Sequence, residues 1–94
     1  MIQGYKDPRG ARLYEGENIR AWAAFRRQAE KRLRILDAAD RIETLMLLPS
    51  NRFEALRGKR NGQYSIRIND QWRICFTWPE GAPGPGDVEI VDYH

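Results

Sequence analysis

Residues 62–78, "GQYSIRINDQWRICFTW", constrain the fold more than any other part of the chain, because two alternating runs flank a short polar turn. Apolar side chains occupy every second position in both runs: Tyr64, Ile66 and Ile68, then Trp72, Ile74, Phe76 and Trp78. A period of two is typical of a strand with one buried face. The segment therefore predicts an antiparallel β-hairpin.

The length of the turn sets how the two strands pair. A two-residue turn would place Ile66 opposite Arg73, whereas a three-residue turn places Ile66 opposite Ile74 and Ile68 opposite Trp72. Only the longer turn keeps both apolar runs on one face of the hairpin, so we predict the longer turn.

The same register assigns four residues to the other face of the hairpin: Ser65, Arg67, Arg73 and Cys75. It sets Arg67 directly opposite Arg73, and like charges in that position repel each other unless an anion lies between them. The arginine pair therefore indicates a phosphate site. Cys75 is expected to be a small packed residue rather than a nucleophile.

Two helices are predicted before the hairpin. From Glu17 onward, apolar residues recur at spacings of three and four along one helix face: Trp22, Phe25, Ala29, Leu33 and Leu36. Asp40, followed three residues later by Glu43, fits an N-terminal capping pattern, which predicts a second short helix over 41–48 that Pro49 ends.

The remaining segments complete an α+β domain. The opening "MIQGY" predicts a short strand, the next five residues "KDPRG" a loop, and the final "DVEIVDYH" a last strand. Two N-terminal helices would then pack on one face of a mostly antiparallel sheet of four or five strands. A chain of 94 residues is large enough for one core, so we predict a single domain over residues 1–94.

The residue types exclude several kinds of site. One cysteine and one histidine are too few for an intrachain disulfide framework or a structural zinc site. The sequence also lacks clustered carboxylates and a glycine-rich phosphate loop before a helix, so neither a metal nor a cofactor is expected. Since no apolar stretch approaches the roughly 18–20 residues of a membrane span, we expect a cytoplasmic protein without a membrane partner.

Positive charge is concentrated between residues 51 and 78, where six cations accompany two anions, although the whole chain has a net charge of only +3. This distribution indicates a surface for a polyanion such as RNA. Ordinary solvated charge would give the same pattern. Metal-free RNA cleavage needs a base for the 2′-hydroxyl, a cation for the phosphate and an acid for the leaving 5′-oxygen. Glu54, Arg73 and His94 supply one group of each kind.

Several dispersed motifs resemble the HigB branch of the RelE toxin superfamily. They are the step Leu56-Arg57-Gly58, the strand Tyr64-Ser65-Ile66-Arg67, the strand Trp72-Arg73-Ile74 and the ending Asp92-Tyr93-His94. The resemblance implies the toxin of a bacterial type II toxin-antitoxin system. Such a toxin is a metal-independent endoribonuclease that cuts mRNA in the A site of the 30S ribosomal subunit. A HigA-like helix-turn-helix antitoxin holds it inactive.

The resemblance also implies which residues act. The catalytic C-terminal trio of the family corresponds to residues 92–94, and its basic residue after the leucine corresponds to Arg57. Many HigB proteins carry a histidine at the position where this chain has Glu54. The related YoeB toxins carry a glutamate there, together with an arginine and a histidine that match Arg73 and His94.

We therefore expect Glu54 to be the general base, Arg73 to bind the scissile phosphate and His94 to be the general acid. Because histidine has an ordinary pKa of about 6.5, a neighbour such as Asp92 or the terminal carboxylate would have to favour its protonated form. The other expected RNA contacts are Tyr93, which would stack on a base, and the cations Arg57, Lys59, Arg60 and Arg67.

Two other functions use the same architecture. ParE-like toxins share the fold but act on DNA gyrase and lack a Glu-Arg-His set. A basic RNA- or ribosome-binding module would block translation without cutting. In a purely structural role, Glu54 would only pair with Arg57 or Arg73 on the surface, and Tyr93 would only pack on the sheet.

Overall fold

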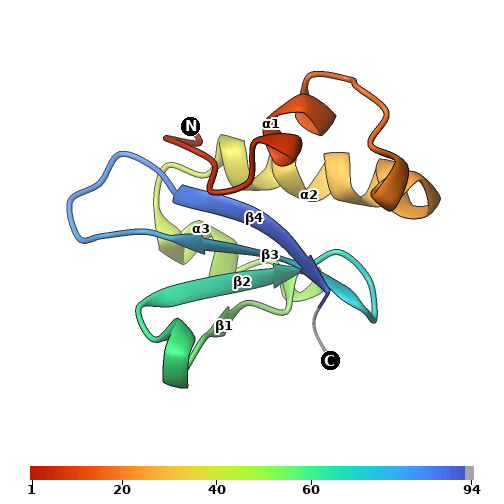
Figure 1. Ribbon diagram of the computed structural model, residues 1–94. Helices are drawn as coiled ribbons and strands as arrows, with labels where there is room; N and C mark the ends of the chain where they lie inside the picture. Colours follow the sequence, from red (N-terminus) through yellow and green to blue (C-terminus); the bar gives the residue numbers. More distant parts are fainter. Residues whose placement is uncertain (93–94) are drawn as a thin grey trace.

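The computed structural model describes residues 1–92 and shows helices covering one face of an antiparallel sheet (Figure 1). The helices are α1 (Pro8–Tyr14), α2 (Arg26–Ala38) and α3 (Ile42–Met46), with 3₁₀ turns η1 (Arg20–Phe25), η2 (Pro49–Asn51) and η3 (Gly58–Arg60). The strands are β1 (Glu54–Ala55), β2 (Gln63–Arg67), β3 (Trp72–Thr77) and β4 (Gly86–Asp92), and they pair in that order. The predicted α+β class is confirmed. Within residues 1–92, no helix has the length and apolar character that crossing a membrane requires.

The hairpin of β2 and β3 has the predicted register. Ile66 pairs with Ile74, and the backbone N–H of Ile68 donates to the carbonyl of Trp72 at 2.9 Å across a three-residue turn. Asn69 stabilises this turn, because its Oδ1 accepts from the backbone N–H of Trp72 at 2.8 Å. The alternating apolar residues of both strands consequently face the helices.

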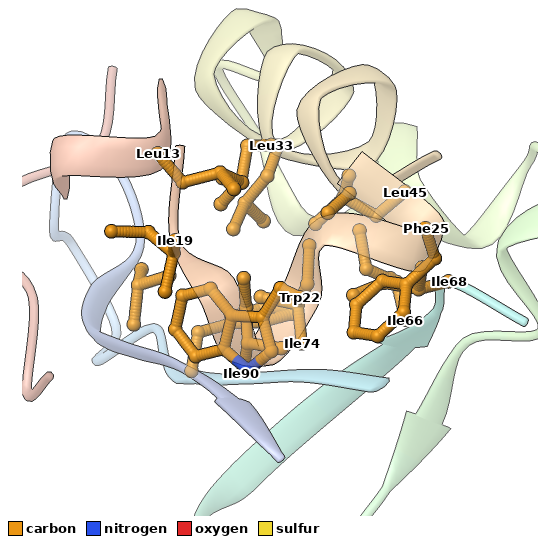
Figure 2. Packing of buried hydrophobic residues seen from close by; sticks show 14 of the residues in the cluster. Leu13, Ile19, Trp22, Phe25, Leu33, Leu45, Ile66, Ile68, Ile74 and Ile90 are labelled. Atoms are coloured by element: carbon orange, nitrogen blue, oxygen red, sulfur yellow. The ribbon is translucent and has the colours of Figure 1, made fainter. Parts of the chain in front are cut away.

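The core lies between that face of the sheet and the helices. Figure 2 shows Trp22 and Phe25, both from η1, directed at the strand residues Ile66 and Ile74. Phe25 also stacks on Trp72, with ring centroids 4.9 Å apart. Trp22 is only 1% exposed, so the apolar helix face predicted from the spacings of three and four is buried against the sheet.

The N-terminal third of the chain differs from the prediction. The loop predicted from "KDPRG" is wrong, because α1 begins there: Asp7 accepts from the backbone N–H of Arg9 at 3.0 Å, and Pro8 occupies the first helical position. The helix predicted to begin at Glu17 instead starts as the 3₁₀ turn η1 and becomes α-helical at Arg26. The described residues therefore form three α-helices where two were predicted.

The capping pattern predicted before α3 is wrong as well. Arg41 is the cap residue of this helix and its side chain makes no capping hydrogen bond, so Asp40 lies one residue too early to cap. The helix covers Ile42–Met46, which is shorter than the predicted 41–48. Pro49 follows the helix as expected and also opens η2.

The opening segment lies beside β4. Tyr5 bridges Val88 in the parallel direction, and the backbone N–H of Gln3 donates to the carbonyl of Pro85 at 2.7 Å. The predicted opening strand is thus present as a single bridge, and the chain end is tied to the sheet.

Gly84→Ala is expected to destabilise the fold by about 1–3 kcal/mol, because an added Cβ would lie 1.9 Å from the carbonyl oxygen of Met1. That contact is with backbone, so the opening segment would have to move. Gly86→Ala is the matched control, since its Cβ would come no closer than 3.4 Å to Thr77. Thermal unfolding measures the stability of both variants, and an equal loss of unfolding free energy in the two would contradict the expectation.

Candidate active site

The candidate site lies on the sheet face turned away from α1 and α2, here called the outer face. Glu54 of β1 lies opposite Ser65 of β2, and Ser65 lies opposite Cys75 of β3. Directly opposed residues of antiparallel strands point to the same side of the sheet. Glu54, Ser65 and Cys75 therefore form one row across the outer face, and the arginine pair at 67 and 73 forms the next row.

Hydrogen bonds hold Arg73 across β2, toward the loop before β1. Its Nε donates to Ser65 Oγ at 2.7 Å, and its Nη2 donates to the carbonyl of Arg52 at 2.5 Å. Ser65 is fully buried beneath this side chain. Because Ser65 is also the partner of Glu54 in the β1–β2 pairing, the predicted base and the predicted phosphate ligand share one region of the outer face.

Arg67 lies opposite Arg73 as predicted, but the two guanidinium groups have separate partners. Arg67 forms an ion pair with Asp70 in the hairpin turn, while Arg73 bonds to Ser65. Asp70 thus offsets the positive charge of Arg67 within the chain itself. The side chain of Asp70 is 98% exposed, so this ion pair is open to competition from an anion in solution.

The other predicted phosphate ligands fall into two groups. Arg57 and Glu54 line the same shallow pocket of about 420 Å³ along the edge strand, and Lys59 is exposed in the neighbouring turn η3. Arg60 instead contacts Glu89 of β4, with Nη1 at 3.1 Å from Oε2. Arg57 therefore borders the same pocket as Glu54, whereas Arg60 is directed toward the opposite edge of the sheet.

The predicted C-terminal residues are only partly described. Asp92 lies opposite Trp72, whose ring packs on the helices, so Asp92 belongs to the helix-facing side while Arg73 belongs to the outer face. Its Oδ2 accepts from Gln71 Nε2 at 3.0 Å. Tyr93 and His94 lie outside the described residues, and their predicted roles stay predictions.

Comparison with known proteins identifies the family. Residues 3–94 match the family described as "RelE-like toxin of type II toxin-antitoxin system HigB". The chain belongs to this family. It is also 47% identical over 52 residues to Toxin HigB-1 of Vibrio cholerae serotype O1. That match covers 55% of this chain and 55% of the relative, so it spans about half the length of each. The HigB resemblance predicted from the sequence motifs is confirmed.

Cys75 is a packed residue of the sheet. It is fully buried, and burial is the main cause that raises the pKa of its thiol. A protonated, inaccessible thiol is not a nucleophile, so the prediction of a packed cysteine is confirmed. Residues 1–92 also contain no group of three or more His, Cys, Asp or Glu side chains placed to hold a metal ion.

Two neighbouring residues at the site were not anticipated from the sequence. Arg52 contributes its backbone carbonyl to Arg73, and its φ of 45° and ψ of 52° lie in the left-handed region that few side chains adopt. Asn51, just before it, is fully buried. The burial of Asn51 could not be predicted from the sequence, because nothing in the neighbouring residues indicates which groups it bonds to.

Proposed function

We propose that this chain is the toxin of a type II toxin-antitoxin pair and that it cleaves mRNA in the A site of the ribosome. Its partners would be the ribosome, the mRNA and a cognate helix-turn-helix antitoxin, and its place of action the cytoplasm. The observation that supports the proposal most is that Glu54 and Arg73 lie on the same face of the sheet: Glu54 pairs with Ser65 across β1 and β2, and Ser65 accepts a hydrogen bond from Arg73. A carboxylate and a fixed guanidinium on one face suit attack on a phosphodiester.

The proposed reaction begins when Glu54 removes the proton from a 2′-hydroxyl of the mRNA. The 2′-oxygen attacks the adjacent phosphorus, and the charge on the five-coordinate phosphate is stabilised by Arg73, with Arg57 and Arg67 adding further contacts. The bond from phosphorus to the 5′-oxygen then breaks, and His94 donates a proton to that oxygen. The products are a 2′,3′-cyclic phosphate and a 5′-hydroxyl, and no oxidant or cofactor is consumed.

The remaining site residues would assist this reaction. The carboxylate of Asp92 would favour the protonated imidazole of His94. Tyr93 would stack on a base next to the cut. Lys59 and Arg60 would contact the flanking backbone, where each phosphate contact makes binding more dependent on salt.

His94→Ala tests whether the toxin cuts or only binds. Loss of a general acid is expected to lower mRNA cleavage on programmed ribosomes by about 100-fold or more and to relieve growth inhibition on induced expression. The melting temperature of the variant is measured in parallel, so that a loss of folded protein can be told apart from a loss of chemistry. Full growth inhibition by this variant would contradict cleavage and favour a ParE-like gyrase toxin or a translation inhibitor that does not cut.

A further inference from the structure

A buried polar link connects α2 to the loop that leads into the outer face. Arg32 of α2 is only 9% exposed, and its Nη1 donates to Oδ1 of Asn51 at 2.8 Å and to Oγ of Ser50 at 3.2 Å. The side-chain amide of Asn51 donates in turn to the carbonyl of Leu45 at 3.1 Å. A buried amide that is bonded through both its oxygen and its nitrogen has one orientation. Asn51 is therefore fixed against α2, through Arg32, and against α3, through Leu45.

Asn51 immediately precedes Arg52, whose backbone is strained. The left-handed backbone of Arg52 persists only where the surroundings hold it, since a side chain there is unfavourable. The backbone N–H of Asn51 donates to the carbonyl of Leu48 at 3.0 Å, and that of Arg52 donates to the carbonyl of Pro49 at 3.1 Å. Together with the anchored amide, these bonds close the turn and set the direction of the Arg52 carbonyl.

The Arg52 carbonyl and Ser65 Oγ both accept hydrogen bonds from Arg73 and help to orient it. These two bonds leave from different nitrogens of one planar guanidinium. Two such bonds fix the plane of the group and therefore the directions of its other N–H groups. A shift of the carbonyl would rotate this plane without removing the positive charge.

We propose that Asn51, held by Arg32, is a positioning residue for Arg73: it fixes the Arg52 carbonyl that aims the guanidinium at the scissile phosphate. This role rests on the proposed cleavage of mRNA. A displacement of about 1 Å at a reacting group is sufficient to cost about 100-fold in rate, so a buried residue without substrate contact acts strongly on catalysis. A purely structural role would lower only the fraction of folded toxin.

A double-mutant cycle on ribosomal mRNA cleavage separates these two roles. Asn51→Ala is expected to lower the single-turnover rate at saturating ribosomes by about 10- to 100-fold in the wild-type background. In the Arg73→Ala background the same substitution should change the rate less than about 2-fold, because the group that it positions is gone. Equal fold losses in both backgrounds would overturn the positioning role.

Two further variants keep the test decisive. Ser50→Ala removes only the longer of the two bonds from Arg32 and should leave cleavage within about 2-fold of wild type. If Asn51→Ala does not fold, Asn51→Asp replaces it in the cycle, because the carboxylate keeps the shape and the acceptor for Arg32 while losing the donor to Leu45. A loss in Ser50→Ala equal to that of the Asn51 variant would contradict the role assigned to Asn51.

A spectroscopic measurement tests the geometry without using cleavage. The Nε–H of Arg73 donates to a fully buried serine, so its proton should exchange slowly with water in ¹⁵N-labelled wild-type protein. In Asn51→Ala the exchange should be at least about tenfold faster, and in Ser50→Ala unchanged. If wild-type toxin does not cut mRNA, the proposed function fails even when the faster exchange in Asn51→Ala is observed. If it cuts and the exchange is unchanged in Asn51→Ala, the positioning role fails.

Discussion

Arg73→Ala is expected to lower mRNA cleavage on ribosomes by about 100- to 1,000-fold, the usual effect of removing one preorganised donor from a developing oxyanion. The guanidinium has fixed partners on the outer face at Ser65 and at the Arg52 carbonyl, so it needs little reorganisation when a phosphate arrives. Arg73→Lys should retain part of the activity, because lysine keeps the charge and loses the planar, two-pronged contact.

Stability has to be followed in the same experiment. Removing the guanidinium leaves the buried hydroxyl of Ser65 without this donor, which is expected to cost about 1–3 kcal/mol of unfolding free energy. Cleavage rates should therefore be compared at a temperature where wild type and Arg73→Ala are both folded. Arg27→Ala is the control, since Arg27 is exposed on α2, away from the outer face. Equal rate losses in the two variants would show that net charge, and not the position of Arg73, decides cleavage.

The hairpin shows why part of the fold is readable from sequence. Its register follows from local facts, since only a three-residue turn keeps Ile66 and Ile74 on one face, and Asn69 supplies the bond that this turn needs. Arg73 is assigned to the outer face by the same alternation. The start of α1 was also encoded locally, by Asp7 capping and Pro8 in the first turn, but "KDPRG" fits a loop equally well.

The rest of the site depends on contacts that no short segment contains. β1 is only two residues long, Glu54–Ala55, so no alternation reveals which way Glu54 points, and its pairing with Ser65 decides this. The link from Arg32 to Asn51 joins residues 19 apart in the chain. The family resemblance groups Asp92 with the catalytic residues, whereas strand pairing sets its side chain on the face opposite to Arg73.

Glu54 and Arg73, the proposed base and the proposed phosphate ligand, lie on the same face of the sheet through strand pairing and the hydrogen bond from Arg73 to Ser65. The proposed acid, His94, lies outside the described residues. A test of the 2′-hydroxyl nucleophile therefore addresses the face of the sheet that the structure describes, because this nucleophile belongs to the RNA.

An mRNA with a single 2′-deoxy nucleotide on the 5′ side of the cut is expected to resist cleavage by at least about 1,000-fold. The proposed nucleophile belongs to the substrate, so its removal leaves Glu54 with no proton to take and Arg73 with no five-coordinate phosphate to stabilise. The measurement is primer extension across the site on ribosomes programmed with either mRNA, with a cyclic-phosphate assay of the upstream product.

The matched control moves the 2′-deoxy nucleotide to the 3′ side of the cut, where the missing hydroxyl is not next to the scissile phosphate and cleavage should be normal. Cutting at an unchanged rate beside the 5′-side deoxy nucleotide would contradict attack by the 2′-hydroxyl. The carboxylate of Glu54 would then have to activate a water molecule, and the cyclic phosphate would be absent from the products. Resistance of both substrates would instead locate the effect in RNA binding at the outer face, where shape and 2′-hydroxyl contacts distinguish RNA from DNA.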